Sequence, residues 1–285
     1  MTVYEVINAR ILKALEQGTA PWNKPWRGAA NQPKNLTSGK EYRGINVFVL
    51  SAMGYTSPYW LTFNQAKTLG ANVRRGEHGT PVVFWKFGSR EIQDGEDITT
   101  QRTVLARYYT VFNVEQIEKL DVSTALIMPK PPASPIAECE LLLASYIGKP
   151  EVKHAEQRAW YHKVFDIVNM PQRATFVSQE QYYGTLFHEL THSTGHPKRL
   201  NRPTLMDAAA FGDENYSKEE LVAEMGAAYL CGVAGIENAT INQSASYLAG
   251  WLQALRNDHR LLISAASQAQ KAVDYIRGCQ IAMAA

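Results

Sequence analysis

The chain has 285 residues, of which 45% are hydrophobic and 20% charged, and its formal net charge is +2. This composition is that of a soluble globular protein and excludes a largely disordered or fibrous chain. No apolar run approaches the roughly 18 residues that a membrane-spanning helix needs, and the N-terminus lacks the basic and apolar stretches of a signal peptide. We therefore expect a cytoplasmic protein with no membrane partner.

The charge is unevenly distributed along the chain. Residues 1–130 contain 16 Lys+Arg and 11 Asp+Glu, whereas residues 131–285 contain 13 and 16. The length favours two domains, and the charge difference indicates that they have different tasks. The three cysteines are widely spaced and form no Cys-x-x-Cys pair, so they predict buried thiols rather than metal ligands.

The N-terminal half is predicted to be a small α+β domain. Residues 3–15 have apolar side chains at helical spacing, and a loop rich in Trp, Pro, Gly and Asn follows over residues 19–43. Residues 62–69 predict a short helix. Residues 81–87 and 103–111 predict strands, because β-branched and aromatic residues cluster there.

Basic and aromatic residues are interleaved in this half. Bases stack on aromatic rings while Lys and Arg neutralise phosphates, so the mixture favours binding of single-stranded DNA. The same aromatics are equally suited to the core of a small domain, and the sequence leaves both interpretations open. The candidate DNA contacts are Trp22, Trp26, Arg27, Tyr42, Arg43, Arg74, Arg75 and Lys86.

The prolines between Pro129 and Pro135 predict a linker, which divides the chain into domains of residues 1–128 and 136–285. After the linker the pattern becomes mostly helical, with residues 165–168 as a short strand. A small sheet packed on helices is expected, so the fold class of the whole chain is α+β. The predicted helices cover residues 178–196, 217–235, 242–256 and 258–277.

The first of these helices contains a His-Glu-x-x-His motif formed by His188, Glu189 and His192. Two histidines four residues apart share one face of a helix, so both imidazoles can reach one metal ion. The glutamate between them faces the open coordination position and is a candidate general base. Ser178 and Gln181 are positioned to form a capping box at the start of this helix. The alternative is that these are solvated helix histidines without a metal.

A catalytic zinc usually has a third protein ligand. The longer metzincin motif would place a histidine at position 198, which is Lys198 here. The best candidate is Glu220, on a second predicted helix whose small residues allow close approach. That segment resembles the second helix of gluzincin-type peptidases, which implies that Glu220 binds the metal and that Glu224 orients a histidine. Alternatively, Ser217 and Glu220 form a capping box.

With this ligand set, the expected chemistry is hydrolysis of an amide, with Glu189 accepting a proton from water. Tyr216 and His162 are candidates to stabilise the oxyanion. Residues 165–168 are expected to form an edge strand beside the metal helix, where an extended peptide substrate could pair. The expected metal is Zn²⁺, although Mn²⁺, cobalt or nickel also suit two histidines and a carboxylate.

Several segments spread along nearly the whole chain occur in a characteristic order and spacing. They are Gly18-Thr19-Ala20-Pro21-Trp22 with Pro25-Trp26, Tyr42-Arg43-Gly44-Ile45-Asn46, Val111-Phe112-Asn113-Val114, the metal motif, and Glu219 to Ala228. In these segments the chain resembles the ArdC family of plasmid-borne antirestriction proteins. The resemblance implies a single-stranded-DNA-binding domain joined to a zincin-like metallopeptidase domain, and protection of incoming plasmid DNA from restriction during conjugation.

Two other functions fit the same residues. One is a protease that cleaves DNA–protein crosslinks or serves another regulatory role, which would also combine a metal motif with a DNA-binding module. The other is a non-enzymatic protein that coats single-stranded DNA, with a metal that only stabilises the C-terminal fold. Replacing Glu189 separates the enzymatic interpretations from the structural one.

Overall fold

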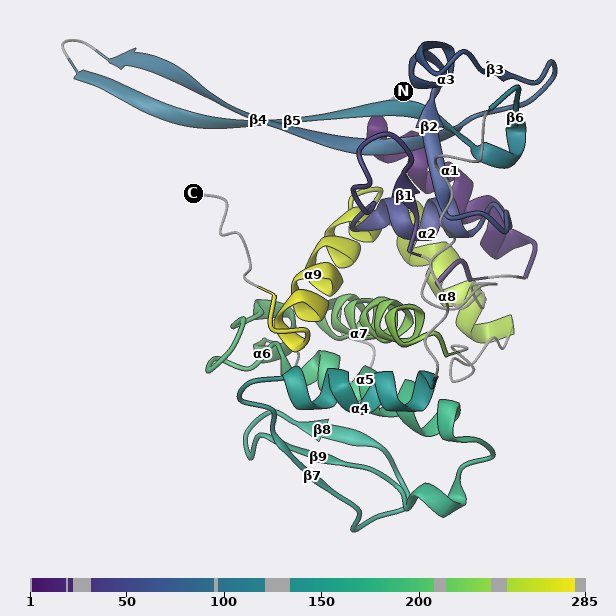
Figure 1. Ribbon diagram of the computed structural model, residues 1–285. Coiled ribbons are helices and arrows are strands. Elements are labelled where there is room, and N and C mark those ends of the chain that lie inside the picture. The colour runs from purple at the N-terminus through teal and green to yellow at the C-terminus, as the bar shows by residue number, and fades with distance from the viewer. Residues whose placement is uncertain are drawn as a thin grey trace.

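The computed structural model describes residues 2–18, 20–22, 32–94, 97–120, 134–207, 214–236 and 245–279. Figure 1 shows a long β-hairpin at one end of the molecule, a group of helices in the middle, and a small sheet at the opposite end. The mixed α+β class predicted from the sequence is confirmed. None of the described helices is long and apolar enough to cross a membrane.

Helix α1 (Val3–Glu16) opens the N-terminal region, as the periodicity predicted. The Thr2 hydroxyl accepts a hydrogen bond from the Glu5 amide, and the Glu5 carboxylate accepts one from the Thr2 amide, which is the reciprocal capping box that starts a helix. Its buried face carries Ile7, Ile11 and Leu15. Two shorter helices follow, α2 (Ile45–Ser51), which the sequence did not predict, and α3 (Phe63–Thr68), which it did.

The N-terminal sheet is dominated by a hairpin of two long antiparallel strands, paired from Thr80 opposite Val111 to Asp94 opposite Asp97. The strands are longer than predicted, because the residues beyond Phe87 and before Thr103 are mostly polar and give no apolar signal. The strand order is β1-β2-β5-β4, and β3 pairs with β6 in a second small sheet. The strands are β1 (Lys34–Asn35), β2 (Tyr59–Thr62), β3 (Asn72–Val73), β4 (Thr80–Asp94), β5 (Asp97–Asn113) and β6 (Ile117–Glu118).

The C-terminal region begins with α4 (Pro135–Ser145), where the Ser134 hydroxyl accepts a hydrogen bond from the amide of Ala137. The last proline of the expected linker therefore starts a helix, a position that suits its fixed backbone angle. Residues 129–133 lie outside the described part of the chain, so the domain boundaries stay a prediction.

A three-stranded sheet follows α4, in the order β7-β9-β8. The prediction of an edge strand at residues 165–168 is wrong. Phe165 and Asp166 belong to the turn before β9, and β9 itself is the central strand, with Val168 fully buried. The edge strand on the side of β9 away from β7 is β8. The strands are β7 (Glu151–Lys153), β8 (Trp160–His162) and β9 (Ile167–Asn169).

Four long helices in the rest of the chain match the predicted ones to within a few residues at each end. Helices α5 and α7 pack closely where Gly226 faces Thr191. A Cβ on Gly226 would lie 2.4 Å from Thr191 Cγ2 and 2.6 Å from its Oγ1, so the small residue permits the close approach that the sequence indicated. The helices are α5 (Gln179–Ser193), α6 (Pro203–Met206), α7 (Glu214–Ala234), α8 (Ala245–Asn257) and α9 (Leu261–Ile276).

The two regions share one hydrophobic core. Buried side chains of α1, α2 and Trp22 belong to the same cluster as those of α5, α7 and α9. Polar contacts cross the same boundary: Arg43 pairs with Asp274, and the Gly44 amide donates a hydrogen bond of 3.0 Å to the Gln270 side chain. Residues of the N-terminal region are therefore in a position to contact the helices that carry the metal motif.

Candidate metal centre

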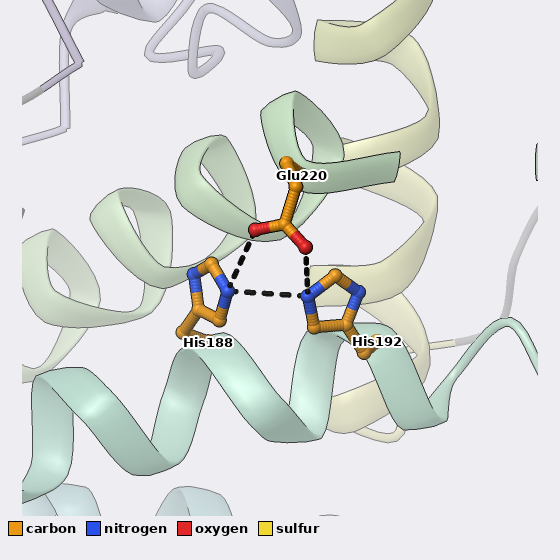
Figure 2. Close-up of side chains that lie close together, drawn as sticks. All are labelled: His188, His192 and Glu220. Carbon is orange, nitrogen blue, oxygen red and sulfur yellow. Dashed lines mark hydrogen bonds and ion pairs between the residues drawn. The ribbon is translucent and has the colours of Figure 1, made fainter. Parts of the chain in front are cut away.

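His188 and His192 lie one turn apart on α5. This helix begins where the Ser178 hydroxyl accepts a hydrogen bond of 3.2 Å from the amide of Gln181. The Nε2 atoms of the two histidines are 3.1 Å apart, and Figure 2 shows both rings pointing toward α7. The spacing of the motif on a helix produces this convergence, as predicted.

Glu220 on α7 completes a group of three side chains. Its Oε2 lies 3.5 Å from His188 Nε2, and its Oε1 lies 3.5 Å from His192 Nε2. The three ligand atoms all lie within 4.8 Å of one another. Metal–ligand bonds of about 2.0–2.2 Å place the ligands of one ion at this separation, so the residues fit a divalent metal such as zinc.

The start of α7 decides between the two interpretations of Glu220. The helix begins at Glu214, so Ser217 lies inside it and cannot act as its N-cap. The capping-box alternative is therefore wrong. The Glu220 carboxylate is free of that task and faces the histidines instead, as Figure 2 shows.

In the metal-free protein, neighbouring groups shift the pKa values of Glu220 and His188. Burial by itself would raise the pKa of Glu220, but the two histidines and a hydrogen bond with Tyr216 lower it to about 2. Burial would lower the pKa of His188, but its hydrogen bond with Glu220 and the charges of Glu189 and Glu220 raise it to about 9. A metal ion would compete with a proton for this site.

Glu189 and Tyr216 lie beside the three ligands. Glu189 is buried, and its charge acts on both His188 and Tyr216. Burial and the neighbouring Glu220 raise the pKa of Tyr216 to about 12. His162, the other candidate for the oxyanion, stacks on Phe165 with ring centroids 4.6 Å apart. None of the contacts found among the described residues joins His162 to the metal motif.

Sequence reasoning missed a buried carboxylate behind His192. Glu219 accepts a hydrogen bond from the Nδ1 side of His192 at 3.3 Å and is only 3% exposed. Burial would raise the pKa of Glu219, but hydrogen bonds from His192 and Arg202 lower it to about 2. The local pattern could not reveal this role, because Arg202 lies outside the predicted helices.

Glu224, expected to orient a histidine, is also buried. Its Oε2 accepts a hydrogen bond of 2.8 Å from the indole N–H of Trp22, and its charge helps to raise the pKa of His188. It therefore lies close to the metal motif and is held by a residue of the N-terminal region. Its role in orienting a histidine remains a prediction.

The predicted DNA contacts are in several different environments. Trp22 is fully buried, with its ring 6.1 Å from that of Trp251, so the structure favours the core interpretation and the DNA interpretation is wrong for this residue in the conformation described. Tyr42 is half-buried against a small apolar cluster, and Arg43 is paired with Asp274. Arg74 and Arg75 are exposed, and Arg74 pairs with Glu77 at 3.0 Å. Trp26, Arg27 and the side chain of Lys86 lie outside the described residues.

The base of the hairpin exposes aromatic side chains that the sequence did not single out. Phe84 and Tyr109 are 54% and 46% exposed, and their rings meet edge to face at 5.8 Å. Phe84 pairs across the strands with the exposed Arg107. Leu105 and Tyr108 are also about half exposed. Because side chains alternate along a strand, Leu105, Arg107 and Tyr109 lie on one face of β5 and Tyr108 lies on the other.

Comparison with known proteins identifies the family. Residues 140–268 match the family model of a zincin-like metallopeptidase, and residues 1–112 match that of the N-terminal domain of the anti-restriction factor ArdC. The metal-free crystal structure of the antirestriction protein ArdC from plasmid R388 is 38% identical, with a TM-score of 0.77 over 97% of both chains. This chain belongs to the ArdC antirestriction family. The Mn(II)-bound structure of the R388 protein matches with 39% identity and a TM-score of 0.75.

Two other relatives differ in how much of their own length matches this chain. The uncharacterized protein y4eC of Sinorhizobium fredii is 34% identical over 98% of this chain and 92% of its own length. DNA primase TraC of Escherichia coli is 37% identical over 96% of this chain, but the match covers only 27% of the primase. The chain thus spans about a quarter of that relative's length. The family match and the three converging side chains together establish a zincin-like domain with a candidate metal site.

Proposed function

We propose that this protein is an antirestriction protein that binds single-stranded DNA and carries a metallopeptidase centre, and that it protects incoming plasmid DNA during conjugation. The observation that carries the proposal is the convergence of His188, His192 and Glu220 beside a buried Glu189. The Mn(II)-bound structure of the R388 protein supports metal binding in the family. We propose Zn²⁺ as the metal, with Mn²⁺ as the alternative.

The residues around the site have distinct tasks in this proposal. A divalent ion held by the two histidines and Glu220 supplies Lewis-acid chemistry for the hydrolysis of an amide. Glu189 accepts the proton of the attacking water, since it follows His188 on the same helix and lies close to it. Tyr216 keeps its proton at neutral pH and donates a hydrogen bond to the developing oxyanion.

The N-terminal region offers the DNA-binding surface. Arg74, Arg75 and Arg107 are exposed cations, and Phe84 and Tyr109 are exposed aromatic rings on the hairpin. Cations that neutralise phosphates and rings on which bases stack are what single-stranded DNA requires. The relative named DNA primase TraC supports a role at DNA, since it contains a region similar to this whole chain.

The decisive variant is Glu189→Gln, which removes the base but preserves the shape of the side chain. Glu180→Gln, in the first turn of the same helix, is the matched control. We expect Glu189→Gln to lose protection of a plasmid that is conjugated into a restricting recipient, while it binds a single-stranded oligonucleotide like the wild type. Equal protection by Glu189→Gln and the wild type would instead support the non-enzymatic function.

A further inference from the structure

The two ring nitrogens of His192 face different partners. Its Nε2 points to the site shared with His188 and Glu220, at 3.1 Å and 3.5 Å. Its Nδ1 lies 3.3 Å from Oε1 of Glu219, on the opposite side of the ring. A neutral imidazole has one protonated nitrogen and one free lone pair, so a carboxylate at Nδ1 favours the tautomer that leaves Nε2 free.

Glu219 is itself held from outside α7. Arg202 donates from Nε to Oε2 at 3.1 Å and from Nη2 to Oε1 at 2.5 Å, and the Thr204 hydroxyl donates to Oε2 at 2.6 Å. The Arg202 and Glu219 side chains are each 3% exposed. These contacts leave the carboxylate little freedom to rotate, because both of its oxygens accept directed hydrogen bonds.

Arg202 is in turn anchored to the end of the metal helix. It donates from Nη1 to the Thr194 hydroxyl at 2.6 Å and from Nη2 to the Thr191 carbonyl at 2.8 Å. Gly195 leaves room for the guanidinium, since a Cβ there would lie 2.9 Å from Nη2 and 3.0 Å from Cζ of Arg202. The guanidinium therefore links the end of α5 to Glu219 on α7.

A buried ion pair is a poor source of net stability, because the cost of removing both charges from water offsets their attraction. The Arg202–Glu219 pair, however, makes a directed hydrogen bond with His192, which is a proposed metal ligand. We propose that Arg202 and Glu219 form a positioning pair that fixes the ring orientation and tautomer of His192 and thereby sets the metal affinity of the centre. The inference rests on the metal centre proposed above.

The size of the expected effect follows from this role. Removing the outer hydrogen-bond partner of a metal-binding histidine typically lowers metal affinity by about 10- to 100-fold. Glu219→Ala alone would leave the Arg202 charge buried without its carboxylate, which destabilises a fold strongly. A sharper variant is the double replacement Glu219→Leu with Arg202→Met, which removes both charges and keeps apolar volume in their place.

The control is a second ion pair, whose side chains are 3% and 16% exposed. Arg199 pairs with Asp166, and Arg199 also donates to the carbonyl of Ser193 at 2.7 Å near the end of α5. The variant Arg199→Met with Asp166→Asn removes these charges without touching His192. Asparagine is chosen because residue 166 has a positive φ of 55°, which asparagine tolerates.

The experiment is isothermal titration of each metal-stripped full-length protein with Mn²⁺ and with Zn²⁺, accompanied by the visible spectrum of the Co²⁺ form. Thermal unfolding of the metal-free forms shows whether each variant is folded. We expect the Glu219/Arg202 variant to lose about 10- to 100-fold in affinity and to change the Co²⁺ spectrum, while the Arg199/Asp166 control does neither. Should the double variant not fold, Glu219→Gln is the substitute, with a smaller loss and the same spectral change.

Two results would overturn the inference, and they are distinguishable. If the wild type binds neither metal, the proposed centre fails and the positioning pair with it. If the wild type binds but the folded Glu219 variants match its affinity and spectrum, the centre stands and the positioning role is wrong. The spectrum matters because a merely structural pair would change stability without changing the ligand geometry of the metal.

Discussion

The metal centre and the N-terminal region of this protein differ in what directs their candidate side chains. His188, His192 and Glu220, chosen from spacing on two helices, converge within 4.8 Å. The residues chosen as DNA contacts are spread between the core, an ion pair and the surface. Helical spacing determines the relative direction of side chains, whereas loop residues receive their direction from whatever packs against them.

The largest expected effect is the loss of metal affinity when a proposed ligand is removed. His188→Ala and Glu220→Ala each remove a proposed ligand, so we expect each to lose more affinity than the 10- to 100-fold typical of an outer partner. Metal analysis of the purified variants, with Lys198→Ala as an exposed control outside the ligand set, measures this. Stoichiometric metal in both variants would show that other residues bind it.

The next prediction tests whether Trp22 belongs to the core. Trp22→Phe keeps a large ring but removes the indole N–H that donates to Glu224, and loss of a buried hydrogen bond of this kind costs about 1–3 kcal/mol. Denaturant unfolding should show this loss of stability. Affinity for a single-stranded oligonucleotide, measured on the folded variant, should not change. Weaker DNA binding at unchanged stability would restore the DNA interpretation of Trp22.

A third prediction concerns the surface that the sequence did not single out. Phe84→Ala combined with Tyr109→Ala should weaken binding of a single-stranded oligonucleotide, by about 1–3 kcal/mol for each base that stacks on a ring. Phe165→Ala is the control, because that ring is 71% exposed and lies between β8 and β9, whose sheet is at the end of the molecule opposite the hairpin (Figure 1). Fluorescence anisotropy measures the oligonucleotide affinity of the wild type, the double variant and the control. Equal affinities would remove the hairpin from the proposed DNA surface.

The smallest expected effect is the pH dependence of the metal-free protein. The pKa of His188 is raised to about 9, so its pairing with Glu220 stabilises the fold fully below the ordinary histidine value of about 6.5. That contribution is lost as the pH rises from about 6.5 through about 9. Thermal unfolding of the metal-stripped protein should therefore show a loss on the alkaline side. His188→Gln should lack that loss, and an identical slope in this variant would contradict the raised pKa.

Local sequence features were enough to predict much of the fold and the central part of the site. The boundaries of α1 follow from apolar spacing and from the capping pair of Thr2 and Glu5. The two histidines were found because they are four residues apart on one helix. Small residues on α7 also indicated its close packing, which Gly226 makes against Thr191. In each case the residues that gave the signal are near one another in sequence or lie on one repeating face of a helix.

The tertiary structure alone decided the rest, because those contacts join residues far apart in the chain. Trp22 and Glu224 are hydrogen-bonded although they are 202 residues apart in the sequence. No local pattern could therefore show that Trp22 belongs to the core rather than to a DNA surface. The order of β7, β9 and β8 made residues 167–169 a central strand rather than an edge. The sequence determined which helix carries the metal motif. The packing of α5 against α7, and the return of Arg202 to Glu219, decided how that motif is completed and held.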